Sequence, residues 1–410
     1  MIIKDALTHA HEFGELSLYV HIPFCVKKCD YCDFYSQTEI RKELIDAYVN
    51  NVCREIDHLS DIYAKAFYTI FIGGGNPGLL GVENLLRIVH ASSKNGSSQE
   101  MTIEMNPDTL NLDMLENTVS YIDRISLGVQ SLHTKNLLMI GRNTTRERTL
   151  SGLSAFSSFR DNFSLNIDLI QGIPEQGFTD TIEDIEQIYS LVRPDHLSLY
   201  DLIIEDGTPL KKRLYRQGKL HTDNNGNVLI DIASSEELLR SLGYSHYEIS
   251  NYAQPDKECL HNSHYWKMLP YIGIGAGAVS TLYTEEGPMR ITGSKNMLAY
   301  AYENTLFSDK IYTANMLSAK EFLEEILIMG LRTDRGVSLG RVKRIFGMDL
   351  LKLLETSLQT WNERGCITST EKHLAVTKEG MRTLNTILID MFVDIDSYEG
   401  SYHMVLDTSF

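Results

Sequence analysis

Six strand-like segments alternate with helix-like segments through the first half of the chain. The predicted strands are residues 16–22, 67–73, 101–106, 124–130, 163–170 and 196–203. The helical patterns between them are residues 41–62, 82–91, 112–120, 146–156 and 180–192. Strands that alternate with helices predict a parallel sheet covered by helices. We therefore expect an α/β fold for this half.

Several of the predicted strands carry polar side chains on one face. Residues two apart in a strand point the same way, so Thr102 shares a face with Glu104, and Asn166 shares one with Asp168. A strand of an ordinary parallel sheet is apolar on both faces. The polar faces therefore predict a partial (β/α)6 barrel whose interior is a binding cavity. In βα barrels the site lies at the carboxyl ends of the strands.

Three cysteines, Cys25, Cys29 and Cys32, follow the first predicted strand. Thiolates at such short spacing suit an iron–sulfur cluster or zinc better than an inert core. Structural zinc usually takes four protein ligands, and no further cysteine follows before Cys53. A disulfide framework is not expected in a long chain with six cysteines. Three ligands would leave one iron of a cubane cluster free to bind a reactant.

A glycine run, Gly73 to Gly75, ends the second predicted strand. Backbone without side chains lets a ligand approach closely and exposes N–H groups. The same run also occurs in tight loops that bind nothing. Because it would lie beside the cysteine loop on the same rim, we interpret it as part of a ligand site.

The formal net charge of −17 narrows the classes of partner. A strongly acidic chain is disfavoured as a general nucleic-acid binder or as a ligand of anionic membranes. No apolar run approaches the ~20 residues of a spanning helix, and the first residues do not form a signal peptide. We therefore expect a cytoplasmic protein with no integral membrane segment, whose cysteines stay reduced.

Ten short segments of the chain match one family in order. They are residues 19–34, 73–77, 104–107, 124–131, 141–142, 168–174, 196–200, 247–252, 261–266 and 330–336. On these motifs the chain resembles the radical S-adenosylmethionine (SAM) proteins. More narrowly, it resembles the group that contains oxygen-independent coproporphyrinogen III oxidase, also called the dehydrogenase, and a related heme chaperone.

The resemblance implies a cofactor set and a site. Cys25, Cys29 and Cys32 would ligate a [4Fe–4S] cluster, and SAM would chelate the fourth iron. A reduced cluster would pass an electron to SAM, which splits into methionine and a 5′-deoxyadenosyl radical. The positions that match SAM contacts are Tyr19, Tyr31, Gly74, Gly75, Asn76, Glu104, Gln130, Arg142, Asp168 and Leu202. Alternatively, Glu104, Gln130 and Asp168 form a structural polar network inside the barrel.

Two features favour the heme chaperone branch over the dehydrogenase branch. The motif of the dehydrogenase branch contains a fourth cysteine two positions after the third. This chain has Phe34 at that position and so resembles the chaperone branch. Cys25 also lies close to Met1, without the long leading segment of the dehydrogenases. The chaperone would bind the cluster, SAM and heme and transfer heme to a recipient protein. The alternatives are oxidative decarboxylation of coproporphyrinogen III to protoporphyrinogen IX, or a radical SAM reaction on another substrate. An electron donor such as flavodoxin or ferredoxin is implied, and whether the chain is an enzyme stays open.

A heme candidate lies at residues 259–266, Cys-Leu-His-Asn-Ser-His-Tyr-Trp. Histidine and cysteine are the usual axial ligands of heme iron, and aromatic rings pack on its flat macrocycle. His261 is the candidate ligand. The alternative is a structural loop at the barrel mouth with His261 hydrogen-bonded to backbone.

Three regions are predicted along the chain. Residues 1–240 would form the radical SAM core domain. Residues 241–310 would extend the barrel, after a helix at 228–242, and carry the His-Asn-x-x-Tyr-Trp motif. Residues 311–410 would form a mainly helical, winged-helix-like C-terminal domain. In that domain we expect helices at 320–331, 339–346, 350–364 and 378–392, and short strands at 367–369 and 374–376.

Overall fold

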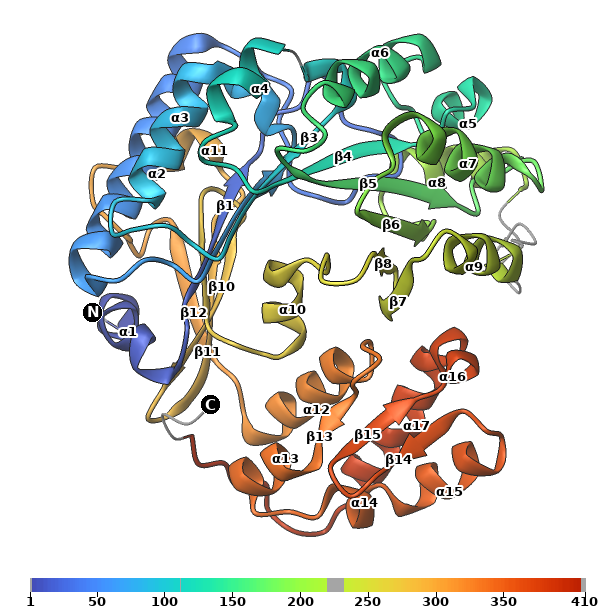
Figure 1. The fold of residues 1–410 in the computed structure, drawn as a ribbon. Helices are drawn as coiled ribbons and strands as arrows, with labels where there is room; N and C mark the ends of the chain where they lie inside the picture. Colours follow the sequence, from blue (N-terminus) through green and yellow to red (C-terminus); the bar gives the residue numbers. More distant parts are fainter. Residues whose placement is uncertain (1, 111, 220–231, 407–410) are drawn as a thin grey trace.

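The computed structural model describes residues 2–110, 112–219 and 232–406. Its main feature is a twelve-stranded mixed sheet in the order β12-β11-β10-β9-β1-β2-β3-β4-β5-β6-β8-β7. Six central strands run parallel in chain order, as predicted (Figure 1). They are β1 (Ser17–Ile22), β2 (Thr69–Gly74), β3 (Glu100–Met105), β4 (Arg124–Gln130), β5 (Ser164–Gln171) and β6 (His196–Asp201).

Helices cover the outer face of this parallel half (Figure 1). They are α2 (Lys42–Tyr63), α3 (Gly81–Ser92), α4 (Leu112–Thr118), α5 (Thr134–Met139), α6 (Arg146–Ser157) and α7 (Asp180–Val192), with short turns η2 (Pro77–Leu80) and η3 (Pro107–Thr109). The predicted helices and strands of this half agree within three residues at each end, apart from α5, which was not predicted. The order of the strands is linear within the described residues, so the barrel is partial.

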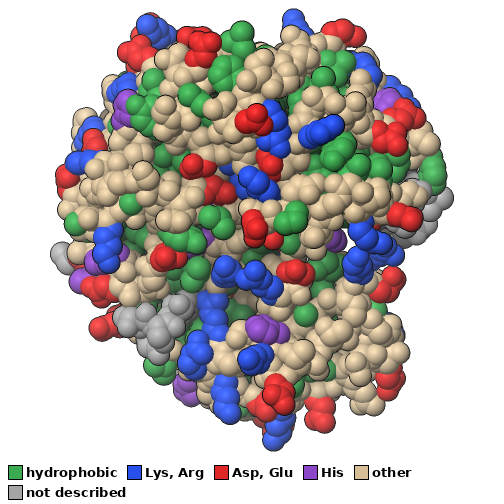
Figure 2. All heavy atoms as spheres, viewed as in Figure 1, with side chains coloured by type: hydrophobic (Ala, Val, Ile, Leu, Met, Phe, Trp, Pro, Cys, Tyr) green, Lys and Arg blue, Asp and Glu red, His purple; other side chains and the backbone are tan. Residues whose placement is uncertain are grey.

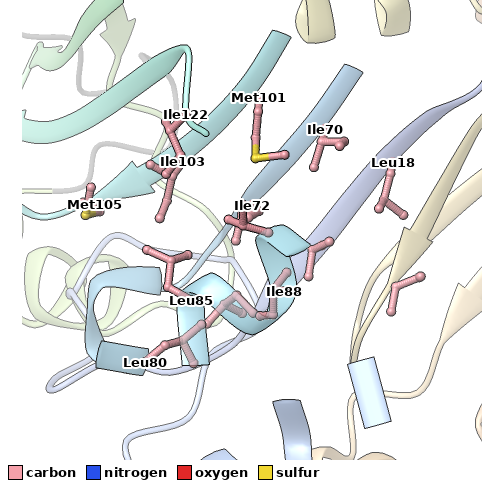
Figure 3. Close-up of a cluster of buried hydrophobic side chains, with 14 of the residues drawn as sticks. Leu18, Ile70, Ile72, Leu80, Leu85, Ile88, Met101, Ile103, Met105 and Ile122 are labelled. Atoms are coloured by element: carbon pink, nitrogen blue, oxygen red, sulfur yellow. The ribbon is translucent and has the colours of Figure 1, made fainter. Parts of the chain in front are cut away.

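The outward faces of the central strands build the main hydrophobic core. Leu18, Ile70, Ile72 and Ile103 are all fully buried and point toward the helices (Figure 3). Leu85 of α3 packs into the same cluster. Removing this much apolar surface from water stabilises the sheet on one side only. The other face is therefore free to carry the polar side chains that the sequence places there.

The edges of the sheet come from segments for which no strands were predicted. On one side β9 (Tyr271–Ile274) pairs parallel to β1, and β10 (Val279–Thr284), β11 (Gly287–Gly293) and β12 (Tyr312–Met316) continue antiparallel. On the other side β8 (Asn251–Ala253) pairs antiparallel to β6, and β7 (Ser245–Glu248) ends the sheet. The remaining elements of this part are α1 (Ile2–His9), η1 (Ala10–Phe13), α8 (Pro209–Arg216), α9 (Ile232–Ser241), α10 (Leu260–Trp266) and α11 (Met297–Ala301). Residues 228–231 of the predicted helix at 228–242 lie outside the described residues.

The last hundred residues add a second, smaller core (Figure 1). A three-stranded sheet, β13-β15-β14, lies among short helices. The elements are α12 (Ala319–Gly330), β13 (Val337–Ser338), α13 (Leu339–Phe346), α14 (Leu350–Leu353), α15 (Glu355–Glu363), β14 (Ile367–Ser369), β15 (His373–Val376), α16 (Lys378–Arg382) and α17 (Leu384–Asp396). This is a mainly helical region, as predicted, and the exact domain boundaries stay a prediction.

The β7–β8 hairpin joins the two parts of the molecule. Ile249 N donates to the carbonyl of Arg332 at 2.8 Å, and Asp334 N donates to that of Tyr247 at 3.0 Å. On the face shown in Figure 2, acidic and basic side chains are interspersed over both parts. Among the described residues, no helix combines the length and the apolar character that crossing a membrane requires.

Candidate functional site

The three cysteines of the sequence motif line one cavity of about 510 Å³ at the carboxyl ends of the parallel strands. Backbone hydrogen bonds shape their loop, with Cys25 N donating to Gln37 O at 2.9 Å and Cys32 N donating to Cys29 O at 3.2 Å. All six cysteines, which lie within the described residues, are free of disulfides. Burial raises the pKa of Cys25 and Cys32, so metal binding has to displace protons from these thiols.

The cysteine arrangement fits a cluster better than a single metal ion. Among the described residues, no three His, Cys, Asp or Glu side chains converge closely enough to hold one ion. The three thiols nevertheless face the same cavity and influence one another electrostatically. Three thiols that face one cavity suit an iron–sulfur cluster, whereas structural zinc usually takes four protein ligands.

The glycine run lets β2 end directly against the cysteine loop. A Cβ added at Gly75 would lie 2.6 Å from the carbonyl oxygen of Phe24 and 3.1 Å from the Sγ of Cys25. Gly74 has a φ of +112°, which only glycine adopts without strain, and a Cβ there would overlap the ring of His21. Both glycines line the cavity. Any larger residue at either position would push the loops apart.

Asn76 lies at the same corner and is almost fully buried. Its Oδ1 accepts hydrogen bonds from Gly78 N at 3.2 Å and from the hydroxyl of Thr109 at 3.1 Å. Asn76 therefore caps η2 and ties it to the loop after β3. Only its amide nitrogen is left for a ligand in the cavity.

Two carboxylates from the inner face of the barrel reach the cavity. Glu104 accepts from Gly74 N at 2.9 Å, and burial raises its pKa to about 7, with Asp168 adding to the rise. Asp168 accepts from Asn166 Nδ2 at 2.8 Å and from Ser126 Oγ at 3.2 Å. Burial raises its pKa although these donors oppose the rise. The two carboxylates can accept hydrogen bonds from ammonium or hydroxyl groups of a ligand.

Arg142 brings a cation into the same space. Its Nη2 donates to Asn106 Oδ1 at 2.6 Å and to the carbonyl of Gly128, and its Nη1 points to the Sγ of Cys29 at 3.6 Å. Gln130 has a φ of +68° at a bulge between β4 and β5, which turns its side chain toward Gly128. A guanidinium with unused N–H groups suits a carboxylate ligand.

Tyr31 and Leu202 form the apolar side of the cavity. Both pack against a small buried cluster of Ile140, Ile170 and Ile173. A flat apolar group such as an adenine ring would fit against such a wall. The structure thus brings together Cys25, Cys29, Cys32, Tyr31, Gly74, Gly75, Asn76, Glu104, Gln130, Arg142, Asp168 and Leu202.

Two of the candidate cofactor-binding residues, Tyr19 and His261, do not line this cavity. Tyr19 lies on the inner face of β1, with its hydroxyl 2.9 Å from His21 Nδ1. His261 is fully buried on α10, where Nδ1 lies 2.7 Å from Thr69 Oγ1 and Nε2 lies 2.7 Å from Tyr265 Oη. Burial lowers its pKa to about 3. Both ring nitrogens therefore already have hydrogen-bond partners within the chain. Ligation of heme iron by His261 stays a prediction.

The cavity also has lining residues that sequence reasoning missed. Asn106 was not among the candidate site residues, although the period-two spacing that pairs Thr102 with Glu104 places Asn106 on the same face. Tyr200 and Ile203 form an apolar rim and are 42% and 69% exposed. Ile203 was the last residue of the predicted strand at 196–203, but β6 ends at Asp201, so strand periodicity does not place its side chain.

Comparison with known proteins places this site in a family. The Radical SAM superfamily matches residues 19–185, and the HemN C-terminal domain matches residues 317–383. The heme chaperone HemW of Escherichia coli K12 is 31% identical over 383 residues, which cover 91% of this chain and 97% of that protein. The chain belongs to the HemW family. HemW of Lactococcus lactis is 30% identical over 92% of this chain and 97% of its own length.

A solved structure confirms the fold of this chain. Coproporphyrinogen III oxidase (HemN) from Escherichia coli, a radical SAM enzyme, aligns with a TM-score of 0.76 and 20% identity over 94% of this chain and 92% of that one. The predicted radical SAM barrel with a helical C-terminal region is therefore correct. A [4Fe–4S] cluster and SAM are the cofactors of this superfamily, and the donor set of the cavity fits both.

Proposed function

We propose that this chain is a heme chaperone that holds a [4Fe–4S] cluster and SAM, binds heme and passes it to a recipient protein. The observation that carries the proposal is the alignment with nearly the whole length of a heme chaperone HemW. The cavity supports it, because its lining offers three thiols, two carboxylates and a guanidinium, the set the two cofactors require. The proposed location is the cytoplasm, where half-buried thiols stay reduced.

The chain's own residues would divide the work in the cavity. Cys25, Cys29 and Cys32 would hold the cluster, which, when bound, supplies an electron to SAM. Arg142 would pair with the carboxylate of SAM through its free N–H groups. Glu104 and Asp168 would accept hydrogen bonds from SAM hydroxyl and ammonium groups. Tyr31 and Leu202 would shield the adenine from water.

The proposed heme ligand, His261, lies on α10. His261, Tyr265 and Trp266 lie on one short helix that packs against β2. His261 is held between Thr69 and Tyr265, so it would have to exchange the Tyr265 hydroxyl for iron. Heme binding would then accompany a local rearrangement of α10. The recipient would be a protein that takes up heme from this chain.

The proposed electron donor is an acidic one-electron carrier such as flavodoxin or ferredoxin. Lys27 and Lys28 are exposed on the cysteine loop, between Cys25 and Cys29. They therefore lie at the surface nearest the proposed cluster. Positive charge at that point of an acidic chain would steer an acidic carrier to the cluster. Reduction by such a carrier should weaken with rising salt.

The alternative is oxygen-independent oxidation of coproporphyrinogen III. The fold of HemN favours it, since the two chains superpose over most of their lengths. Anaerobic incubation of the cluster-loaded, reduced protein with SAM and coproporphyrinogen III separates the two functions. The chaperone proposal expects no protoporphyrinogen above the level of a Cys25→Ala/Cys29→Ala/Cys32→Ala control. Protoporphyrinogen formed in step with 5′-deoxyadenosine would establish the alternative.

A further inference from the structure

Asp30, between two of the cysteines, is bound by two other parts of the chain. Its backbone N donates to Ile140 O at 2.9 Å, and its backbone carbonyl accepts from Leu210 N at 2.9 Å. The loop after α5 approaches so closely that a Cβ at Gly141 would lie 2.4 Å from the Asp30 carboxyl carbon. The cysteine loop is therefore packed between the loop at 140–142 and the start of α8.

An ion pair from α8 reinforces this packing. The Arg213 guanidinium pairs with the Asp30 carboxylate and also donates to the carbonyl of Met139. The two charged side chains are 33% and 20% exposed, so the pair is partly shielded from water. Thr208 accepts from Lys211 N and caps α8, which sets the helix in place. Arg213 thus joins three segments that are far apart in the sequence.

We infer that Arg213 is a positioning residue that acts through Asp30 to hold Cys29 and Cys32 at the cavity. Asp30 follows Cys29 directly and precedes Cys32 by two residues, so fixing Asp30 limits the motion of both thiols. The inference rests on the proposed function as far as the cluster is concerned. The restraint on the thiols themselves acts in the metal-free chain as well.

The contacts that Asp30 makes with Ile140, Leu210 and Arg213, together called the Asp30 clasp, also connect the cysteine loop to the rim of the cavity. Leu202, Ile203 and Glu205 line the cavity, and α8 begins four residues after Glu205. The backbone N of Leu202 donates to Gln171 O at 2.9 Å, and the Thr208 hydroxyl donates to Glu205 O at 2.7 Å, so both ends of the short link at 203–205 are held. A molecule that displaces residues 203–205 would therefore pull on α8 and, through Arg213, on the cysteine loop.

The test compares Arg213→Met with Arg213→Lys and with Arg216→Met, a matched control on the exposed face of α8. In the metal-free proteins, the rate of iodoacetamide alkylation of Cys29 and Cys32 is followed by mass spectrometry, with Cys53 as an internal reference. In Arg213→Met, iodoacetamide should alkylate Cys29 and Cys32 at least fivefold faster than in wild type. Arg213→Lys should fall between, and Arg216→Met should match wild type.

A second measurement follows the cluster-loaded proteins. Cluster absorbance should bleach in air several-fold faster in Arg213→Met than in wild type or Arg216→Met. Asp30→Asn keeps both backbone hydrogen bonds and removes the ion pair, so it serves if Arg213→Met does not fold. Unchanged alkylation and bleaching in either variant would overturn the inference. Faster alkylation in a chain whose wild type takes up no iron and sulfide would uphold the clasp and refute the proposed function.

Discussion

Arg142 and Cys29 meet across the cavity, with Nη1 of the guanidinium 3.6 Å from the cysteine Sγ. Cys29 belongs to the loop after β1, whereas Arg142 belongs to the loop after α5. The energetic cost of burying the guanidinium is offset by hydrogen bonds, because Asn106 Oδ1 and the carbonyl of Gly128 accept from its Nη2. A cation held in this way can balance the charge of a thiolate ligand and still bind a carboxylate.

Replacement of this cation should weaken SAM binding. Loss of a hydrogen bond to a charged partner removes about 1.5–3 kcal/mol, so Arg142→Met should bind SAM about 10–100-fold more weakly. Equilibrium dialysis of the cluster-loaded protein against SAM measures the effect. Arg148→Met, which changes an exposed arginine nearby, is the control and should bind like wild type. Equal affinity in Arg142→Met at full iron content would contradict the assignment.

SAM binding should also depend on pH through Glu104. Its pKa is raised to about 7, so a fraction of the chains carries a neutral carboxyl near neutrality. Hydrogen bonds from SAM favour the ionised form, so affinity should rise as pH increases from about 6 to about 8. Glu104→Gln should bind more weakly at pH 8 and lose most of this pH dependence. A wild-type profile that matches that of Glu104→Gln would show that Glu104 does not contact SAM.

The protonation of Glu55 should make the free energy of unfolding, rather than ligand binding, depend on pH. Glu55 is buried on α2, where it accepts from the hydroxyls of Tyr300 at 2.7 Å and Tyr312 at 2.6 Å, and burial raises its pKa to about 7. A folded chain that holds this proton more tightly than the unfolded chain loses stability as pH rises from about 4.5 to about 7. The full loss should be about 3.5 kcal/mol, because the pKa rises from 4.5 to about 7 and each pH unit corresponds to about 1.4 kcal/mol.

The comparison that isolates Glu55 uses Glu55→Gln in the metal-free protein. The free energy of unfolding in urea is measured for both chains at pH 5 and at pH 8. Relative to wild type, Glu55→Gln should gain about 2–3 kcal/mol between the two pH values. A constant difference would mean that Glu55 titrates normally in the folded chain.

Replacement of Tyr265 should strengthen heme binding. The Tyr265 hydroxyl is hydrogen-bonded to Nε2 of His261. Tyr265→Phe removes this hydrogen bond and leaves the nitrogen free to bind iron. If His261 is the heme ligand, Tyr265→Phe should bind hemin about fivefold more tightly, as expected from about 1 kcal/mol per hydrogen bond. His261→Ala should bind at least tenfold more weakly. If neither variant changes hemin affinity, His261 has a structural role.

Most of the parallel half of the fold could be predicted because its signals are local. Each strand has an apolar outer face, such as Ile70 and Ile72, and an amphipathic helix follows it. The site could be predicted as far as period-two spacing brings polar side chains to one rim. That is why Glu104 and Asp168 were found together, and why Ile203, beyond the end of its strand, was missed.

The remaining elements depend on contacts that sequence patterns do not carry. Gly275 and Gly277, with φ values of +108° and +82°, lie between β9 and β10 and break any periodicity there. The helix α10 contains histidines and aromatic residues, which are weak helix formers. It is fixed from outside, because the buried Glu100 accepts from His261 N at 3.1 Å and pairs with Arg124 at 2.9 Å. That ion pair comes from β3 and β4, more than a hundred residues away.

The most direct test of the account is an anaerobic hemin titration of the cluster-loaded wild-type protein, followed by gel filtration. We predict a saturable Soret change with one heme retained per chain, and no effect of replacing exposed Arg148. Heme that washes off completely, from protein with full iron and sulfide content and bound SAM, would contradict the assignment as a heme chaperone.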